Sequence, residues 1–154
     1  FDPAVMTVAV AKTIVDDVFQ FGRNRQFIAA MIQEGKKMYL LDLYLPNSSD
    51  SQKIGYSEDK QKWVLENQAF IWTYFIENKL LYSTDTNLHS RFIDRAPFSK
   101  FYMDFDRESP GSVGVWVGWQ IVRSFMQNNN VTLQQLLQNN AEEIFKKSKY
   151  KPKK

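Results

Sequence analysis

The chain has 154 residues, of which 44% are hydrophobic and 24% are charged, and these proportions are typical of one globular domain rather than of a disordered chain. It contains no cysteine and one histidine, which excludes a disulfide framework, a thiolate zinc site, a cysteine nucleophile and any site that needs two histidines. No stretch reaches the roughly 18 consecutive apolar residues of a membrane-spanning helix. The aromatic share of 15% indicates a substantial core or a large recognition surface.

The net charge of +3 is unevenly distributed along the chain. Six lysines among the last nine residues supply +6, so the remaining residues together carry −3. We therefore expect a single domain over residues 1–148 and a basic C-terminal tail over residues 149–154. A tail of this kind is most often solvated, and contact with a membrane surface or with a partner is the alternative.

Three helices are expected in the first half of the chain. Residues 3–21 are crowded with apolar side chains, as in a helix that is buried nearly all round, although their β-branched content leaves a pair of strands possible. In residues 24–45 apolar side chains recur at spacings of three, four and seven, and Pro46 ends the pattern. A polar loop reaches Gly55, and Ser57 is the expected N-cap of a long amphipathic helix that ends near Lys79.

The second half begins with a long irregular segment. Periodicity lapses over residues 80–112, apart from one short turn near residues 88–93, and a connection of this length usually has a function or is packed on a surface. Pro110 and Gly111 open a further helix that ends near Asn128. A capping box of Thr132 and Gln135 and a last short helix around residues 141–145 follow. The predicted fold class is therefore mainly α, in a single multi-helix domain.

Glu34 is the most informative single residue. At helical spacing it lies among Phe27, Met31, Met38 and Leu41, on the stripe that should face the core. Burying an unpaired charge is costly, so this carboxylate should be paired, hydrogen-bonded, protonated or bound to a metal. An internal salt bridge is the commoner outcome, and a functional role is the alternative.

A second group of candidates lies in the irregular segment and in the helix after it. Bases alternate with aromatic rings here, but acids match the bases almost one for one, so no nucleic-acid partner is expected. The candidate contact surface for a protein partner comprises Arg91, Arg95, Phe98, Phe101, Trp116 and Trp119. Core packing is the competing interpretation for the two tryptophans, because they lie three residues apart on a predicted helix.

Four blocks of the chain together resemble a known family. They are residues 31–39 (MIQEGKKMY), 96–101 (APFSKF), 109–124 (SPGSVGVWVGWQIVRS) and 148–154 (SKYKPKK). These blocks resemble the C-terminal portion of the gliding-motility lipoprotein GldB family of Bacteroidetes, over nearly the whole chain. The resemblance implies a periplasm-facing protein of the cell envelope, with other envelope or motility proteins as partners. It also implies that the protein meets the membrane only through a lipid anchor upstream of Phe1.

The same family looks like a distant relative of predicted gluzincin-like zinc peptidases. In those peptidases a His-Glu-x-x-His helix is followed by a helix that reads Glu-Gly-x-x-x-Tyr, and the glutamate of the second helix is the third zinc ligand. Glu34 and Gly35 match this second motif, Tyr39 falls close to its aromatic position, and residues 114–122 are similar to a later glycine-containing helix of the peptidases. The first motif should lie within residues 8–18, which contain no histidine.

A catalytic zinc needs three protein ligands and an open position for water, and Glu34 lacks the partners for such a site. The resemblance therefore implies the helical peptidase fold with the catalytic motif lost and with no metal or cofactor, in which Lys12 replaces the metal charge beside Glu34. The expected function is that of a non-catalytic envelope domain that supports gliding motility or envelope assembly through protein contacts. Two alternatives are a zinc peptidase whose other ligands lie in a missing N-terminal part, and a peptide- or carbohydrate-binding module.

Overall fold

The computed structural model describes Val8 and residues 24–153. The helix expected over residues 3–21 lies outside the described residues, except for Val8, which is helical and buried. The described elements are all helical, which confirms the mainly α class, and none of these helices combines the length and the apolar character needed to cross a membrane. In chain order they are α2 (Phe27–Tyr44), α3 (Asp50–Ile54), α4 (Glu58–Glu66), α5 (Gln68–Glu77), a π-helical turn (His89–Ile93), a 3₁₀ turn (Asp106–Glu108), α6 (Val113–Asn128), α7 (Leu133–Gln138) and α8 (Ala141–Ser148).

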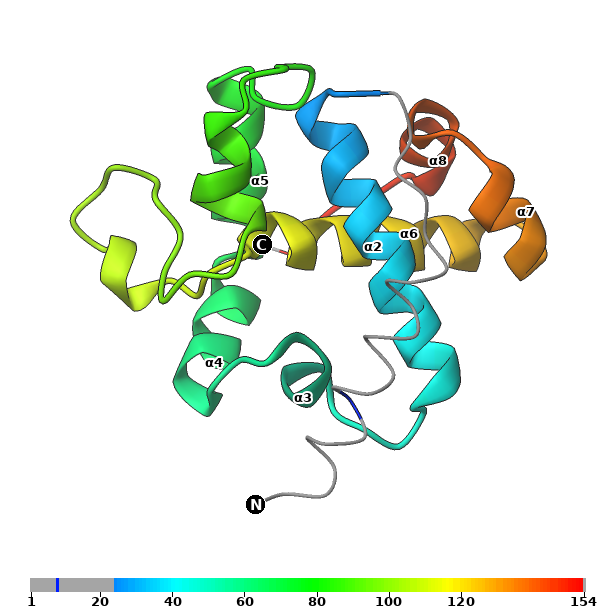
Figure 1. Cartoon of the computed structure of the whole chain (residues 1–154), viewed down its shortest axis with the longest axis horizontal. Coiled ribbons are helices and arrows are strands. Elements are labelled where there is room, and N and C mark those ends of the chain that lie inside the picture. Colours follow the sequence, from blue (N-terminus) through cyan, green and yellow to red (C-terminus); the bar gives the residue numbers. More distant parts are fainter. Residues whose placement is uncertain (1–7, 9–23, 154) are drawn as a thin grey trace.

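Helix α6 is the centre of the fold. Figure 1 shows it running across the molecule with α2 crossing it steeply, and it also packs against α8 and the π-helical turn. Helices α2 and α6 touch backbone to backbone where Gly35 faces Gly118, because a Cβ atom on Gly118 would lie only 1.8 Å from the Met31 carbonyl oxygen. The periodic segments of the sequence predicted both helices, and their observed bounds agree with that prediction.

The helix expected over residues 57–79 is two helices. Ser57 accepts a hydrogen bond from the Lys60 N–H and caps α4, as predicted. The helix is interrupted at Asn67, whose side-chain amide donates to the Trp63 carbonyl at 2.8 Å and whose backbone lies at φ −116° and ψ 16°. An asparagine side chain competes in this way for the backbone groups of a helix. As a result α5 starts as a separate helix with its own direction.

The polar loop expected before Gly55 contains a short helix. Ser49 and Gln52 form a capping box at the start of α3, and Gly55 ends the helix with a left-handed φ of +85°. The equivalent capping box of Thr132 and Gln135 at the start of α7 is the one that the sequence predicted. The loop prediction was wrong for residues 50–54, because the capping signal there lies inside a run of residues that usually form loops.

The chain that follows α8 is packed on the domain. The Trp72 ring of α5 contacts the rings of Phe145 and Tyr150 edge to face, with centroids 5.9 and 5.1 Å away. The Ser148 carbonyl accepts hydrogen bonds from the Ser124 hydroxyl at 2.6 Å and from the Asn128 amide at 2.9 Å. Tyr150 thus fixes the beginning of the basic segment on the surface of the domain.

Candidate protein-contact surface

A short loop lies at the left of Figure 1, and two of its side chains are exposed to solvent. This contact loop comprises residues 101–106, and Tyr102 is 74% exposed while Met103 is 47% exposed. The Asp106 carboxylate accepts hydrogen bonds from the backbone N–H groups of Phe101, Tyr102 and Met103, at 3.1, 2.9 and 3.3 Å. Tyr102 adopts a left-handed φ of +62°, which a bulky residue rarely does. The exposed pair is therefore held in one backbone conformation.

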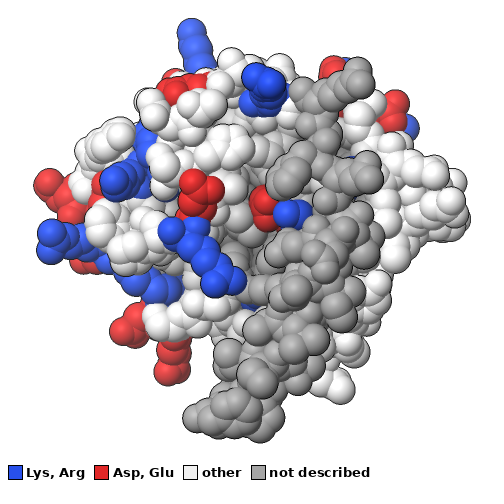
Figure 2. Space-filling view, in the orientation of Figure 1, with Lys and Arg blue, Asp and Glu red and all other residues white. Residues whose placement is uncertain are grey.

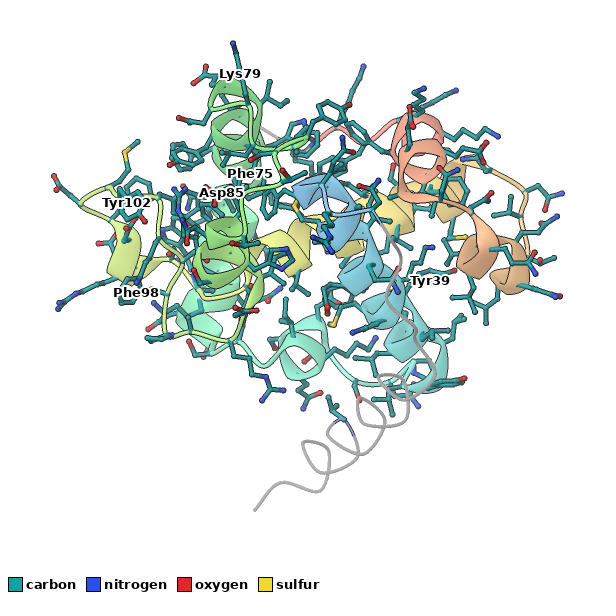
Figure 3. All side chains as sticks on the ribbon, turned by 45° about the horizontal axis from the view of Figure 1, so that its top comes forward. Tyr39, Phe75, Lys79, Asp85, Phe98 and Tyr102 are labelled. Carbon is teal, nitrogen blue, oxygen red and sulfur yellow. The ribbon has the colours of Figure 1, made fainter. Side chains whose placement is uncertain are left out.

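Arg91 supports the loop from below. Its Nε donates to the Lys100 carbonyl at 2.9 Å, and its Nη2 donates to the Tyr74 hydroxyl at 3.1 Å. Its guanidinium carbon lies 4.4 Å from the centre of the Tyr102 ring, within the range of a cation–π interaction. The π-helical turn carries Arg91, and Figure 3 shows Tyr102 in the loop at the left of the view. A cation and an exposed ring thus lie side by side at the tip.

An aromatic cluster anchors the loop to α5. The Phe101 ring lies 5.0 Å from Tyr74, 5.1 Å from Phe92 and 5.7 Å from Phe105 between ring centres. The Tyr74 hydroxyl also donates to the Phe101 carbonyl at 2.9 Å. Phe101 is buried, so the prediction that it forms part of the contact surface was wrong. Its ring is the anchor of the loop, and the neighbouring Tyr102 is the exposed one.

The two tryptophans predicted for the contact surface are also buried. Trp116 and Trp119 lie in the core, with ring centres 5.5 Å apart, and Trp116 stacks on Tyr56 at 6.4 Å. The prediction failed because α6 is covered on several sides by other elements, so residues on more than one of its faces are buried. The competing interpretation, core packing, is the one that the structure shows.

A cavity of about 470 Å³ lies between the α3–α4 region and the irregular segment. Its walls come from the connection between α3 and α4 and from two parts of the irregular segment, residues 95–97 and 110–112. Arg95 is exposed on this cavity, and no acidic side chain is found among its described lining residues. The Tyr56 hydroxyl, whose pKa is raised by burial, donates to the Gly111 carbonyl at 2.7 Å and joins the two walls. Phe98, which was also predicted for the contact surface, is half-buried.

The charges around the contact loop are mixed in sign. Figure 2 shows Lys and Arg interspersed with Asp and Glu over the face that it displays, with no large patch of one sign on the described residues. Such a surface lacks the continuous basic stripe that follows a phosphate backbone. Its apolar tip and single cations suit a protein partner better than a nucleic acid.

Glu34 lies at the edge of the core stripe rather than on it. Met31, Gly35 and Met38 around it are buried as predicted, but the Glu34 side chain is 29% exposed and its Oε1 lies 3.3 Å from the Lys37 Nζ. This ion pair on one helix is the salt-bridge outcome that the sequence left open. Lys12, the expected partner, lies outside the described residues, so its pairing stays a prediction. No group of three His, Asp or Glu side chains that could hold a metal ion occurs within residues 24–153.

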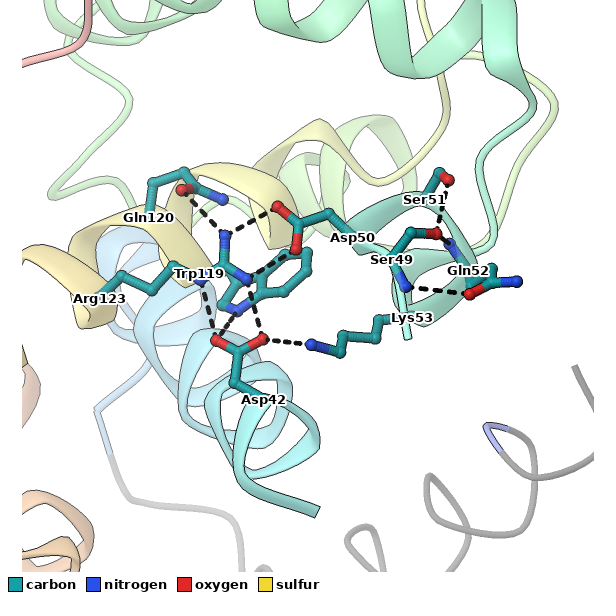
Figure 4. Close-up of polar contacts among 9 residues, drawn as sticks. All are labelled: Asp42, Ser49, Asp50, Ser51, Gln52, Lys53, Trp119, Gln120 and Arg123. Carbon is teal, nitrogen blue, oxygen red and sulfur yellow. Dashed lines mark hydrogen bonds and ion pairs between the residues drawn. The ribbon is translucent and has the colours of Figure 1, made fainter. Parts of the chain in front are cut away.

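A cluster of ion pairs at the edge of the core was not predicted from the sequence. The Asp42 carboxylate of α2 accepts hydrogen bonds from Arg123 and Trp119 of α6 and from Lys53 of α3, and Arg123 also bonds both oxygens of Asp50 (Figure 4). All of these donor–acceptor distances lie between 2.8 and 3.0 Å. The cluster therefore ties α2, α3 and α6 together at one end of the core.

Pairing between the charged groups of this cluster determines the direction of their pKa shifts. Burial alone would raise the pKa of Asp42, but hydrogen bonds from Arg123, Trp119 and Lys53 and the charge of Arg123 hold it below its usual value. Burial would likewise lower the pKa of Arg123, but hydrogen bonds to Asp50 and Asp42 raise it. Every group in the cluster has an assigned partner, so we interpret it as a structural clamp rather than as a reactive site.

Comparison with known proteins gives one match. The model of the lipoprotein family described as gliding motility protein GldB matches residues 1–152. Neither the search among curated proteins nor the search among solved structures found a match. The family match covers nearly the whole chain and agrees with the resemblance carried by the four sequence blocks. This chain belongs to the gliding motility protein GldB family, a lipoprotein family of the cell envelope.

Proposed function

We propose that this chain is a non-catalytic domain that supports gliding motility or envelope assembly by binding another envelope protein through its contact loop. The observation that carries the proposal is the presentation of Tyr102 and Met103, which are exposed although the loop beneath them is fixed by Asp106, Arg91 and the Phe101 anchor. Tyrosine, methionine and arginine are enriched in the centres of protein interfaces.

A fixed loop also favours binding on energetic grounds. Ordering a flexible loop on association costs about 0.5–1.5 kcal/mol for each immobilised side chain. Here three backbone hydrogen bonds to one carboxylate hold the loop before any partner arrives. Most of the binding energy of the two exposed side chains is therefore available for the partner.

The non-catalytic part of the proposal is supported by the surroundings of Glu34. Its carboxylate is paired with Lys37 on the same helix, so an ion pair accounts for its charge. The opposing hypothesis is a zinc peptidase. Zinc analysis of the purified lipoprotein, together with a peptidase assay of Glu34→Gln, separates the two. Zinc bound in a one-to-one ratio, or peptide cleavage that Glu34→Gln abolishes, would overturn the non-catalytic assignment.

The contact loop is tested by a double substitution, Tyr102→Ser with Met103→Ser, in the full-length lipoprotein. A matched control is Tyr82→Ser with Leu65→Ser, because these side chains are exposed to a similar extent, 60% and 49%, but lie outside the loop. Cells that glide and lack their own family member would be complemented with each version. Loss of two interface anchors of this kind typically weakens binding by roughly 30-fold or more.

We expect the loop variant to abolish gliding and the control to restore it, at equal amounts of protein in the envelope. Both variants should unfold at the wild-type temperature, since all four side chains are exposed. Gliding that the loop variant restores fully would refute the contact loop as the binding surface. Equal loss in the control would also refute it, because the effect would then follow from exposed apolar area anywhere on the domain.

A further inference from the structure

The strongest charged feature of the described chain lies far from the contact loop in sequence. Five exposed lysines occupy the last turn of α8 and the segment after it, and together they form what we call the lysine surface: Lys146, Lys147, Lys149, Lys151 and Lys153. The last three alternate with Tyr150 and Pro152 along a stretch that spans at most about 13 Å. This arrangement concentrates positive charge on a small area.

The lysine surface is ordered rather than a loose tail. The Lys147 carbonyl accepts a hydrogen bond from the Asn129 amide at 2.8 Å, and the Ser148 carbonyl accepts two more from α6. Lys149 takes a left-handed φ of +52° and turns the chain away from the axis of α8. Tyr150 then inserts against Trp72, with ring centres 5.1 Å apart. These contacts hold the chain from Lys147 to Tyr150 at a defined place on the domain, and Lys151 follows directly.

Most of this charge is not compensated within the protein. Lys146 pairs with Glu142 at 3.0 Å, and both side chains are largely exposed. Among the described residues, no acidic partner lies within ion-pair distance of Lys147, Lys149, Lys151 or Lys153. An exposed pair such as Lys146 and Glu142 neutralises little in water. The surface therefore keeps a positive potential that is available to an external anion.

An apolar side chain accompanies the lysines. Ile76 lies one helical turn beyond Trp72 on the same face of α5, and it is 50% exposed. Trp72 is the residue on which Tyr150 packs, so Ile76 lies one helical turn from the point where the lysine segment meets α5. Lysines beside exposed apolar groups are typical of protein surfaces that lie at the interface between a membrane and water.

We propose that the lysine surface binds the anionic headgroups of a membrane leaflet and so holds the domain against the membrane. Lysine ammonium groups act as compact point charges, which suit a diffuse layer of phosphates better than a single shaped ligand. Membership of a lipoprotein family places the chain at a membrane. This inference goes beyond protein contacts and uses a different surface.

Vesicle co-sedimentation of the purified chain without attached lipid tests the proposal. The probes are vesicles of phosphatidylcholine alone and vesicles of phosphatidylcholine with phosphatidylglycerol at roughly three to one, at low and high salt. The variant is Lys147→Gln with Lys151→Gln and Lys153→Gln. Lys146 is kept because it is paired with Glu142, and Lys149 is kept because it forms the left-handed turn that ends α8.

The matched control is Lys62→Gln with Lys100→Gln and Arg107→Gln, which removes the same charge from exposed basic side chains elsewhere. Each lysine near an anionic surface contributes about 1 kcal/mol, so the tail variant should bind the anionic vesicles on the order of a hundredfold more weakly. The control should lose less than about fivefold, the effect of one such lysine. Wild-type binding should disappear at high salt and on neutral vesicles.

Two results would overturn the proposal. One is equal binding of the wild-type chain to the anionic and the neutral vesicles. In that case the lysine surface would bind an acidic protein instead of a membrane. The other is equal weakening in the tail variant and the control, which would make binding a matter of net charge. Circular dichroism of each variant checks that the helices are retained.

Discussion

The backbone contact between α2 and α6 is the tightest point of the fold, and Gly118→Ala perturbs it directly. The added Cβ would lie 1.8 Å from the Met31 carbonyl oxygen and 2.4 Å from its carbon. Ordinary carbon–oxygen contacts begin near 3.4 Å, so the helices must separate locally by roughly 1.5 Å. The obstacles are backbone atoms of a neighbouring helix, which cannot rotate away as a side chain does.

The magnitude follows from two opposing effects. Overpacking a core costs typically 1–3 kcal/mol, and the rigid obstacle places this case at about 3 kcal/mol. Alanine is favoured over glycine inside a helix by about 1 kcal/mol. The net loss should therefore be about 2 kcal/mol, which lowers the unfolding temperature of a chain of this length by roughly 4–8 °C.

Urea unfolding followed by circular dichroism measures the change. Gly55→Ala is the comparison, because its Cβ would meet open space and only the left-handed φ of +85° opposes it, at a cost of about 1 kcal/mol. We expect Gly118→Ala to be the more destabilising of the two. If Gly118→Ala were as stable as the wild type, or more stable by the helix-propensity gain, the close approach of α2 and α6 would be refuted.

Two further predictions concern ionisable groups and pH. Asp42→Asn should lower the free energy of unfolding at pH 7 by about 2 kcal/mol, because Arg123 and Lys53 lose a charged partner. Folding lowers the pKa of Asp42, so the stability difference between the wild type and Asp42→Asn should be complete above pH 4 and shrink as pH falls through the folded pKa. A stability difference that does not change with pH would contradict this prediction. Burial lowers the pKa of Lys36, whose Nζ donates to the Asn139 carbonyl at 2.8 Å. The unfolded chain therefore binds more protons than the folded chain just below pH 10.5, so folding becomes more favourable as pH rises. Urea unfolding at pH 7 and pH 10 should show that the wild type gains stability with pH relative to Lys36→Met. If the stabilities of the wild type and Lys36→Met changed equally with pH, Lys36 would not be desolvated by folding.

The fold was predictable where local signals agree with the final packing. The apolar periods of residues 24–45 and the caps at Ser57 and Thr132 predicted α2, the start of α4 and α7, because each of these signals acts within one or two turns. The break at Asn67 was not predicted. The apolar pattern continues through it, and the outcome depends on competition between one side chain and the helix backbone.

The site was less predictable than the fold. Arg123 and Asp42 are 81 residues apart, so no local pattern connects them. Phe101 and Tyr102 are neighbours with opposite fates, one buried and one exposed, and the left-handed backbone at Tyr102 decides between them. Helical periodicity also does not tell how many neighbours surround a helix, which is why Trp116 and Trp119 were assigned to a surface.

Helix α5 connects the two proposed surfaces. Its Tyr74 bonds the Phe101 carbonyl and Arg91 and so supports the contact loop, whereas its Trp72 receives Tyr150 of the lysine surface. Residues two apart on a helix point about 200° away from each other around its axis. A domain held on a membrane by its lysines would therefore turn the contact loop away from that membrane and leave it accessible to a partner protein.

This geometry predicts that the two surfaces act independently. The Tyr102→Ser, Met103→Ser variant should bind anionic vesicles as the wild type does, and loss of the three tail lysines should leave the affinity for the protein partner unchanged when both are free in solution. Substitutions at sites that share no partners are additive within about 0.5 kcal/mol. A loop variant that lost vesicle binding would show that Tyr102 and Met103 insert into the membrane, because the lysines on the far side of α5 would still be in place.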